Sequence, residues 1–501
     1  MPTASSIDRL SRTTTVDASR VDPPIPGHAE LPERILQFGT GAFLRGFVDA
    51  IIDEANRQGH FAGRAVAVSS TGSERTQLFN EQDGLFTVCI QGIEDGEVID
   101  RCRVVGSVSR ALSAATHWSD VLGVARSPHL EYVISNTTEV GISLDPADRL
   151  DANPPLSFPA KLTALLHERA IAFDFRPDRG VIVLCCELIE NNGDRLRDLV
   201  LSLAGQWALG TRFVDWVQDA CAFCNTLVDR IVPGAPADPC ILEKRLGFHD
   251  ALAVHAEPYA LWVIEGDEAL RERLPFSVAD DAIVVTPDIT PFRERKVRIL
   301  NGTHSIMVPI AFLSGHDTVR DSLEDELTGR FVREVMLEEI VPAMDIDPEA
   351  AERFAMQVLD RFANPFIDHD LLTIALQQTS KMNVRVLPSI HSYFARFGRL
   401  PSRLTLGFSA FLAMILRAGR ADKAEFPPDQ GADRVRTHWN ASSGDMHDFV
   451  QRVASDPSIW DAPPARLHGF VDAVQTHVNA ILEDGAIKTL CALYHSTNTR
   501  G

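Results

Sequence analysis

Residues 34–59 read RILQFGTGAFLRGFVDAIIDEANRQG, and this stretch indicates the fold of the first half of the chain. RILQF (34–38) is a short apolar run of the kind found in buried strands, and GTG follows it directly. In AFLRGFVDAIIDEANRQG (42–59) apolar side chains recur at helical spacing, with Phe43 and Phe47 on one stripe. A strand, a glycine turn and a helix in this order predict one unit of a parallel α/β sheet.

Further apolar runs extend this pattern along the chain. They are RAVAVSS (64–70), EYVISN (131–136), GVIVLCCEL (180–188), YALWVIEG (259–266) and AIVVT (282–286). Runs that are apolar throughout suit parallel strands covered on both faces. The segments at 195–209 and 213–232 are predicted as helices from their periodicity. We therefore expect a Rossmann-type, doubly wound α/β domain over residues 31–288, preceded by a polar extension at residues 1–30.

Beyond residue 288 long helical periods replace the strands. LEDELTGRFVREVMLEEIV (323–341) and PEAAERFAMQVLDRF (348–362) are examples of these windows. Because no convincing strand follows, we expect a mostly α-helical second domain over residues 289–501.

The charge balance argues against polyanionic partners. The 69 acidic and 48 basic side chains give a formal net charge of -21, which repels nucleic acid and anionic membranes. A small anionic substrate is still compatible with this charge, because a local pocket of Lys and Arg overrides a distant field. No apolar run resembles a signal-peptide core or a membrane span, so we expect a cytoplasmic protein, either a monomer or a small homo-oligomer.

The eight cysteines are scattered, and we expect them to be reduced structural thiols. Cys185 and Cys186 fall in a predicted strand, and Cys221 and Cys224 form a C-x-x-C in a predicted helix. A C-x-x-C without a second pair of ligands is weak evidence for zinc or redox chemistry, so we predict no metal site.

Gly39 and Gly41 lie between a predicted strand and a predicted helix, where backbone N–H groups can approach a pyrophosphate. Counting G-x-G-x-x-G from Gly39 puts Leu44 in place of the third glycine. The second strand ends in Ser69-Ser70 rather than in the acidic residue that binds the ribose of NAD. Glu74 or Arg75 could supply a ribose or 2′-phosphate contact, or the two could form a solvated ion pair. NAD is expected, and NADP is not excluded.

KVRILNGTHS (296–305) places three polar groups in an apolar helical pattern. At about 100° per residue, Asn301 and His304 lie about 140° and about 80° from Lys296, so all three can border one cleft. A lysine among apolar neighbours can act as a base, and an amide can stabilise an alkoxide-like oxygen. Asn192, which follows the strand at 180–188, is the candidate for a second amide.

The chain also resembles a known family, the polyol-specific long-chain dehydrogenases, which include the mannitol dehydrogenases and the uronate reductases. The matching pieces are ILQFGTGAFLRGF (35–47), ISNTTEVGI (134–142), FPAKLTALLHER (158–169), CCELIENNGDRL (185–196), CNTLVDRIVPG (224–234), AEPYALWVIEG (256–266), PFRERKVRILNGTHS (291–305), NPFIDH (364–369) and SKMNVRVLPS (380–389). The resemblance implies a lysine general acid/base at Lys296 and substrate contacts at Asn192, Asn301 and His304. It also implies a supporting ion pair at Asp229 and Arg230.

The same resemblance implies a nicotinamide dinucleotide cofactor, usually NAD. The expected cofactor contacts are Gly39, Gly41, Ala42, Phe43, Ser70, Thr138 and Glu139. Lys381 and Arg385 lie four residues apart on a probable helix and would meet the carboxylate of a sugar acid, or would form a solvated basic face.

Three segments resemble the uronate reductases more closely than the mannitol dehydrogenases, namely ENNG, AEPYALWVIEG and SKMNVRVLPS. The implied reaction is the NAD-dependent reduction of D-tagaturonate to D-altronate and its reverse. The alternatives are a fructuronate reductase, a mannitol-type polyol dehydrogenase, and a dinucleotide-binding sensor without turnover.

Overall fold

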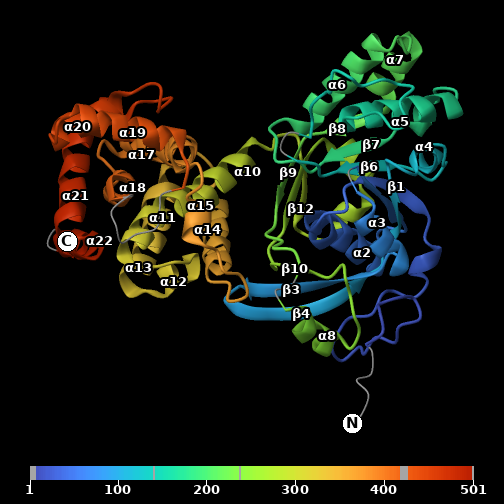
Figure 1. Cartoon of the computed structure of the whole chain (residues 1–501), viewed down its shortest axis with the longest axis horizontal. Helices are drawn as coiled ribbons and strands as arrows, with labels where there is room; N and C mark the ends of the chain where they lie inside the picture. The colour runs from blue at the N-terminus through green and yellow to red at the C-terminus, as the bar shows by residue number, and fades with distance from the viewer. Residues whose placement is uncertain (1–6, 71, 139–140, 236–237, 418–426, 499–501) are drawn as a thin grey trace. The chain divides into compact units, whose positions relative to one another are not determined.

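A computed structural model of the chain describes residues 7–70, 72–138, 141–235, 238–417 and 427–498. The chain divides after Ile289 into two compact units, which are described separately (Figure 1). Unit 1 is the α/β part, and unit 2 begins at Thr290 and also includes the short segment Gly92–Glu97.

Unit 1 is built on a six-stranded sheet in which every neighbouring pair of strands is parallel. In spatial order its strands are β5 (Val108–Ser113), β2 (Arg64–Ser69), β1 (Glu33–Phe38), β6 (Tyr132–Ser135), β7 (Ile182–Cys185) and β8 (Ala222–Cys224). The order reverses between β1 and β6, which is the doubly wound topology of dinucleotide-binding sheets. The predicted Rossmann-type α/β fold is therefore confirmed for unit 1.

Helices cover both faces of this sheet, as Figure 1 shows. On one face pack α4 (Trp118–Ala125), α5 (Phe158–Ala172), α6 (Asn192–Gln206) and α7 (Thr211–Ala220). On the other face pack the π-helical segment η2 (Arg45–Asp49), α2 (Ala50–Arg57) and α3 (Glu74–Glu81). Successive side chains of β1 point to opposite faces of the sheet. Leu36 and Phe38 pack in the core under the first group of helices, and Ile35 packs in the core under the second group.

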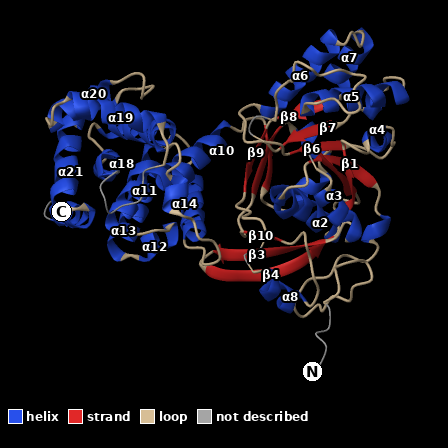
Figure 2. Cartoon of the chain, in the orientation of Figure 1, coloured by secondary structure: helices blue, strands red, loops and turns tan. Residues whose placement is uncertain are grey.

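Two smaller sheets complete unit 1 (Figure 2). One contains β10 (Val254–Ala256), β3 (Phe86–Glu94) and β4 (Glu97–Val105), and the other contains β12 (Ile283–Thr286), β11 (Leu261–Glu265) and β9 (Thr226–Asp229). The strands β3, β4 and β5 had no counterpart in the predicted elements. The turn between β3 and β4 is Asp95-Gly96, and both of its residues have positive φ, at 51° and 78°.

The helix predicted over residues 213–232 is wrong in its second half. Helix α7 ends at Ala220, Cys221 is extended, and the strands β8 and β9 follow. Strand β8 pairs with β7, and β9 pairs with β11 more than thirty residues further along the chain. The residues adopt an extended conformation because they pair with these distant strands, although their local periodicity favours a helix. Packing overrides local propensity in short segments.

The cysteines also differ from expectation at one place. Cys89 on β3 and Cys102 on β4 form a disulfide, whereas all eight were expected to be reduced. The remaining six are free thiols. Burial raises the pKa of Cys221 and of Cys224 to about 12, so both stay protonated at neutral pH. Among the described residues no group of three or more His, Cys, Asp or Glu side chains is placed to hold a metal ion.

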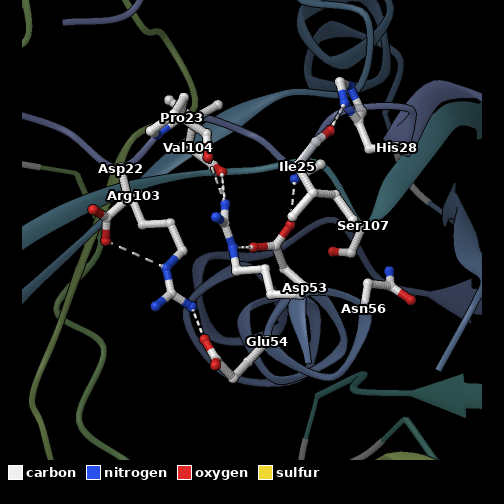
Figure 3. Close-up of polar contacts among 12 residues, drawn as sticks. Asp22, Pro23, Ile25, His28, Asp53, Glu54, Asn56, Arg103, Val104 and Ser107 are labelled. Atoms are coloured by element: carbon white, nitrogen blue, oxygen red, sulfur yellow. Dashed lines mark hydrogen bonds and ion pairs between the residues drawn. The ribbon is translucent and has the colours of Figure 1, made fainter. Parts of the chain in front are cut away.

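The N-terminal segment, expected as a polar extension, packs onto unit 1 from residue 7 onward. Leu10 and Val21 are buried in a small core beside the disulfide. Figure 3 shows the polar contacts that hold the segment and strand β4 on α2. Arg57 bonds to Asp53 at 2.6 Å and donates to the Pro23 carbonyl at 2.8 Å.

Arg103 strengthens the same attachment from β4. It forms ion pairs with Glu54 on α2 and, at 3.8 Å, with Asp22 of the N-terminal segment (Figure 3). The backbone N–H of Gly106 donates to Asp53 at 2.9 Å, so one carboxylate serves both the strand end and Arg57.

Unit 2 from Thr290 onward is helical, which confirms the predicted helical C-terminal region. Its longer helices are α11 (Gly302–Ser314), α13 (Glu326–Glu334), α14 (Pro348–Phe362), α17 (Leu387–Phe397), α18 (Ser402–Arg417), α19 (Gln430–Ala441), α20 (Met446–Ser455), α21 (Phe470–Asp484) and α22 (Ala486–Asn498). The window at 323–341 is broken at Asp325, which caps α13 through Leu327 and Thr328. No helix in the described part of the chain is long and apolar enough to cross a membrane.

Helix α11 lies at the centre of unit 2, between α18 and the π-helical segment η8 (Met382–Val386). Two glycines permit these contacts. A Cβ on Gly407 of α18 would stand 2.4 Å from Ile306, and a Cβ on Gly302 would stand 3.1 Å from the carbonyl oxygen of Arg385. Both crossings therefore place helix backbones closer together than larger residues allow.

A carboxyl group is buried beneath the first strand of unit 1. Asp49, at the end of η2, is only 1% exposed and accepts a hydrogen bond from Gln37 at 3.3 Å. Burial raises its pKa from 3.8 to about 7, and the bond from Gln37 offsets only part of that rise. The folded protein holds a proton that the unfolded chain releases, so the stability of unit 1 falls as pH rises from about 4 to about 7.

We predict that Asp49→Asn removes this loss, because the amide does not ionise and still offers an oxygen to Gln37. The melting temperature of the variant relative to wild type should be higher at pH 8 than at pH 5 by roughly 4–8 °C, which corresponds to about 2 kcal/mol. The exposed Asp219→Asn serves as the control. A difference between variant and wild type that is the same at both pH values would show that Asp49 is ionised at neither or at both.

Candidate active site

The glycine turn after β1 has the geometry of a nucleotide-binding turn. Gly39 has φ 136°, and a Cβ there would stand 2.6 Å from Leu44 and 3.0 Å from the carbonyl oxygen of Asn136. Only glycine fits this position. At Gly41, the N-cap of α1 (Ala42–Leu44), a Cβ would meet nothing within 4 Å, so the backbone there is open to a ligand. Leu44, in place of the usual third glycine, packs over Gly39 instead.

A cavity of about 580 Å³ lies at the carboxyl ends of β1, β2 and β6, where dinucleotides bind in such sheets. It is lined by Phe38, Gly39, Thr40, Gly41, Ser69, Ser70, Arg75, Asn136, Thr137, Thr138, Gly141, Ser143, Leu144, Asp145, Leu156, Ser157, Phe158 and Lys161. Four of the predicted cofactor residues, Gly39, Gly41, Ser70 and Thr138, are in this lining. Its volume and its open glycine turn fit a dinucleotide.

The other predicted cofactor residues are placed differently. Ala42 and Phe43 are in α1 and are not in the cavity lining; Phe43 stacks on Phe47 with the ring centroids 5.0 Å apart. Glu139 lies outside the described residues.

Two charged residues that the sequence analysis missed hold the walls of the cavity. Arg45 is buried beneath the glycine turn, and its Nη1 donates to the Thr40 carbonyl at 2.6 Å. Glu187, buried after β7, accepts hydrogen bonds from the Thr137 backbone at 2.9 Å and from Ser135 at 3.1 Å. Each is a charged residue inside an otherwise apolar run, and that is the signal by which the sequence could have revealed it.

Asn192 is fully buried at the start of α6, and its side-chain amide is occupied within unit 1. Its nitrogen donates to the carbonyls of Cys185 and Glu187, both at 3.0 Å. Its oxygen accepts from the backbone of Gly193 and of Thr226, both at 2.9 Å. The amide thus ties the end of β7 to the start of β9, and both of its N–H groups are in use.

Arg230, expected in a supporting ion pair with Asp229, ties β9 to the segment after the glycine turn. Its Nη1 donates to the Gly46 carbonyl at 3.0 Å, and its Nε donates to the Glu257 carbonyl at 2.8 Å. Asp229 is buried at the end of β9. The pair therefore lies in the framework of unit 1.

Lys296 and Asn301 are in unit 2, in a π-helical segment (η5, Lys296–Asn301) between α10 (Thr290–Arg295) and α11. The backbone N–H of Gly302 donates to the carbonyl of Val297, five residues earlier. Because a π turn closes over five residues, Asn301 returns over Lys296 more nearly than in the α-helix that was expected. His304 follows three residues later, which is one turn of α11. Both Lys296 and Asn301 are half-buried.

The ring of His304 is held from two sides. It stacks on Phe362 with centroids 4.1 Å apart and planes 14° apart, and His369 meets it edge-on at 5.9 Å. Its Nε2 is buried and has no hydrogen-bond partner in the described part of the chain. Burial, followed by the charges of His369, Arg361, Arg385 and Lys381, lowers the pKa of His304 well below 6.5. His304 is therefore neutral at pH 7 and can bond an uncharged hydroxyl or carbonyl.

Lys381 and Arg385 lie beside this helix, because η8 packs on both η5 and α11. Helix α16 (Gln378–Lys381) is fixed to α11 by Gln378, which donates to the Ser305 carbonyl at 2.6 Å. Lys381 Nζ donates to the Ile374 carbonyl at 2.7 Å. The half-buried guanidinium of Arg385 has neither a hydrogen bond nor an ion pair with any described residue, and burial lowers its pKa.

Two carboxylates act on this cluster, and both are bonded elsewhere. Asp368, which acts on His369, pairs with Arg320 at 2.9 Å. Asp429, which acts on Lys381, accepts from the Thr379 backbone at 2.7 Å and caps α19. The cluster therefore retains positive charge that suits an anionic group. Within unit 2 the structure packs together the segments that carry Lys296, Asn301, His304, Lys381 and Arg385.

Comparison with known protein families identifies both parts of the chain. Residues 33–278 match the model of the mannitol dehydrogenase Rossmann domain. Residues 288–482 match the model of the mannitol dehydrogenase C-terminal domain. The two matches together span most of the chain.

The curated relatives are similar over almost their whole length. The altronate oxidoreductase of Bacillus subtilis is 41% identical over 465 residues, which is 92% of this chain and 95% of that protein. The altronate oxidoreductase of Pectobacterium atrosepticum is 40% identical over 465 residues, 91% of this chain and 95% of that protein.

Solved structures share the fold at lower identity. The mannitol 2-dehydrogenase of Pseudomonas fluorescens, in a ternary complex with NAD and D-mannitol, is 23% identical with a TM-score of 0.69 and covers 97% of this chain and 99% of its own. A substrate-free D-sorbitol dehydrogenase is 22% identical with a TM-score of 0.77 and covers 96% of this chain and 100% of its own. By its two domain matches and its curated relatives, the chain belongs to the mannitol dehydrogenase family.

Proposed function

We propose that the protein is an NAD-dependent oxidoreductase that interconverts a sugar-acid ketone and its alcohol, namely D-tagaturonate and D-altronate. The observation that carries the proposal is the cationic pair Lys381 and Arg385 beside the polar face of Lys296, Asn301 and His304. An uncharged polyol has no group that needs two cations, whereas a sugar acid carries one carboxylate. The relatives named altronate oxidoreductase support the same substrate class.

The dinucleotide would bind unit 1 in the cavity at the glycine turn. Gly39 and Gly41 would allow the backbone to approach its pyrophosphate, and Thr138 and Ser70 would border it. When bound, NAD supplies the hydride acceptor for alcohol oxidation, and NADH supplies the donor for ketone reduction. Arg45 and Glu187 would keep the turn and the loop after β6 in place before binding, so little ordering would be needed.

In unit 2, Lys296 would exchange the proton of the reacting hydroxyl. The neutral amine accepts this proton in alcohol oxidation, and the ammonium returns it in ketone reduction. The Asn301 amide has no hydrogen-bond partner among the described residues, so its N–H group is available to the oxygen on which charge develops. Neutral His304 would bond the same or the adjacent oxygen through Nε2, which has no hydrogen-bond partner in the part of the chain that the structure describes.

Asn192 was expected to share the alkoxide with Asn301. Both of its N–H groups already donate to backbone carbonyls of unit 1, so binding a substrate oxygen would require breaking hydrogen bonds inside the buried framework. We therefore propose that Asn192 is a positioning residue of the sheet edge and that Asn301 is the amide that binds the substrate oxygen.

Lys296 is the proposed acid/base of the reaction. We expect Lys296→Ala to lower kcat in both directions by about 10²–10⁴-fold, because the proton transfer loses its acid/base. The dissociation constant for NADH should stay within about twofold, since the cavity is in unit 1. Steady-state assays with D-tagaturonate and D-altronate, together with a fluorescence titration of NADH, measure both quantities.

Two controls sharpen this test. Lys488→Ala removes an exposed lysine of α22 and should change neither kcat nor NADH binding. Added methylamine should partly restore turnover of Lys296→Ala if the missing group is an amine base. Retained turnover in Lys296→Ala would refute the role of Lys296 and would leave a dinucleotide-binding protein with another catalytic group.

Arg385 is the proposed partner of the substrate carboxylate. Arg385→Ala should raise KM for D-altronate by about 10–100-fold, because a charge-assisted bond of about 1.5–3 kcal/mol is lost. The KM for an uncharged polyol analogue of the same carbon number should change less than about threefold. Arg385→Lys keeps the charge but not the planar fork, so its KM for D-altronate should lie between those of wild type and Arg385→Ala.

Arg353→Ala, on the exposed face of α14, is the matched control and should leave both KM values unchanged. If Arg385→Ala raises KM for the polyol and for the sugar acid by the same factor, the cluster does not bind the carboxylate. A wild-type kcat/KM that is highest for mannitol would instead favour a mannitol-type polyol dehydrogenase, and one that is highest for D-fructuronate would favour a fructuronate reductase.

A further inference from the structure

Among the described residues, the β2 edge of the dinucleotide cavity lacks the acidic group that restricts such sites to NAD. In doubly wound sheets an acidic residue after the second strand bonds the adenosine ribose 2′-hydroxyl, and its charge repels a 2′-phosphate. Here the described residues that line the cavity from this edge are Ser69, Ser70 and Arg75. Two hydroxyls and a guanidinium stand where a carboxylate would.

The charges around this edge are consistent with an anionic ligand. The carboxylate among the described lining residues is Asp145, which comes from the loop after β6, and β1 separates β6 from β2. Arg75 is exposed and has no ion pair with any described residue. Glu74, its neighbour on α3, is also exposed and is not in the lining.

A second guanidinium adds to this field from below the turn. Arg45 is buried, its Nη1 is bonded to Thr40, and its Nε has no hydrogen-bond partner in the described part of the chain. Burial, followed by the charge of Arg75, lowers the pKa of Arg45 to about 10, so it is still charged at neutral pH. Asp49 and Asp250 raise the pKa of Arg45 and so offset part of this effect. Arg45 is not in the cavity lining, so it adds to the positive field there without touching a ligand.

We infer that the cavity accepts a dinucleotide with a 2′-phosphate, NADP(H), as well as NAD(H). Arg75 would pair with the phosphate, and the Ser70 hydroxyl would bond either the phosphate or the free 2′-hydroxyl. Serine serves both ligands because its hydroxyl can donate or accept. This inference rests on the proposed function only in requiring that the cavity bind a nicotinamide dinucleotide.

The test is direct binding of NADPH and of NADH to the full-length protein by calorimetry, without any sugar present. The two wild-type dissociation constants should agree within about tenfold. Arg75→Ala should raise the dissociation constant of NADPH by about tenfold or more and that of NADH by less than about twofold, since only NADPH carries the 2′-phosphate. Ser70→Asp should weaken NADPH further while retaining NADH. Raising the salt concentration should weaken NADPH more than NADH, because the exposed pair is screened.

Arg212→Ala, an exposed arginine of α7, is the control and should affect neither nucleotide. NADPH binding that is weaker than NADH binding by more than about tenfold would overturn this inference and leave the proposed function intact. Equal weakening of both nucleotides by Arg75→Ala would also overturn it, because the guanidinium would then not distinguish the phosphate. Failure of both nucleotides to bind wild-type protein would overturn the proposed function together with this inference.

Discussion

The contact of Gly302 with the backbone of Arg385 is the constraint on which the candidate active site depends. A Cβ on residue 302 would stand 3.1 Å from the Arg385 carbonyl oxygen, so only a glycine lets α11 and η8 approach without a shift. The π turn before Gly302 then carries Lys296 and Asn301 toward one face of the helix. One close backbone crossing thus brings the proposed proton-transfer group and the proposed carboxylate-binding cations into the same part of unit 2.

The electrostatics of this cluster suit a substrate that carries one charge and reacts at an uncharged oxygen. Burial and nearby cations keep His304 neutral, so it bonds a hydroxyl or carbonyl without attracting a second anion. Arg385 keeps its charge but has no hydrogen bond or ion pair within the described part of the chain, so an anion that binds there would compensate its partial desolvation. Unit 1 contributes a separate cavity whose open glycine turn fits a dinucleotide, so each ligand of the proposed reaction has its own unit.

Much of the fold followed from local sequence, because apolar runs of buried parallel strands and the Gly39 turn are strong signals. Helix α14 coincides with its predicted window, 348–362. Strands β8 and β9 were missed because their partners lie far away in sequence, which no local period reveals. In unit 2 the segments that carry the predicted site residues pack on one another, and the roles of these residues stay predictions. The π turn was not foreseen, since a widened turn leaves no mark on helical periodicity. The occupied amide of Asn192 was likewise visible only in three dimensions.

The proposed function depends on the recognition of a carboxylate by unit 2. Recognition is measured by comparing two competitive inhibition constants, that of D-altronate and that of its uncharged amide. Both are determined in the reducing direction with D-tagaturonate as substrate. We expect the acid to inhibit at least tenfold more strongly than the amide, and we expect this difference to shrink as the salt concentration is raised. Equal inhibition by the acid and the amide at low salt would contradict it.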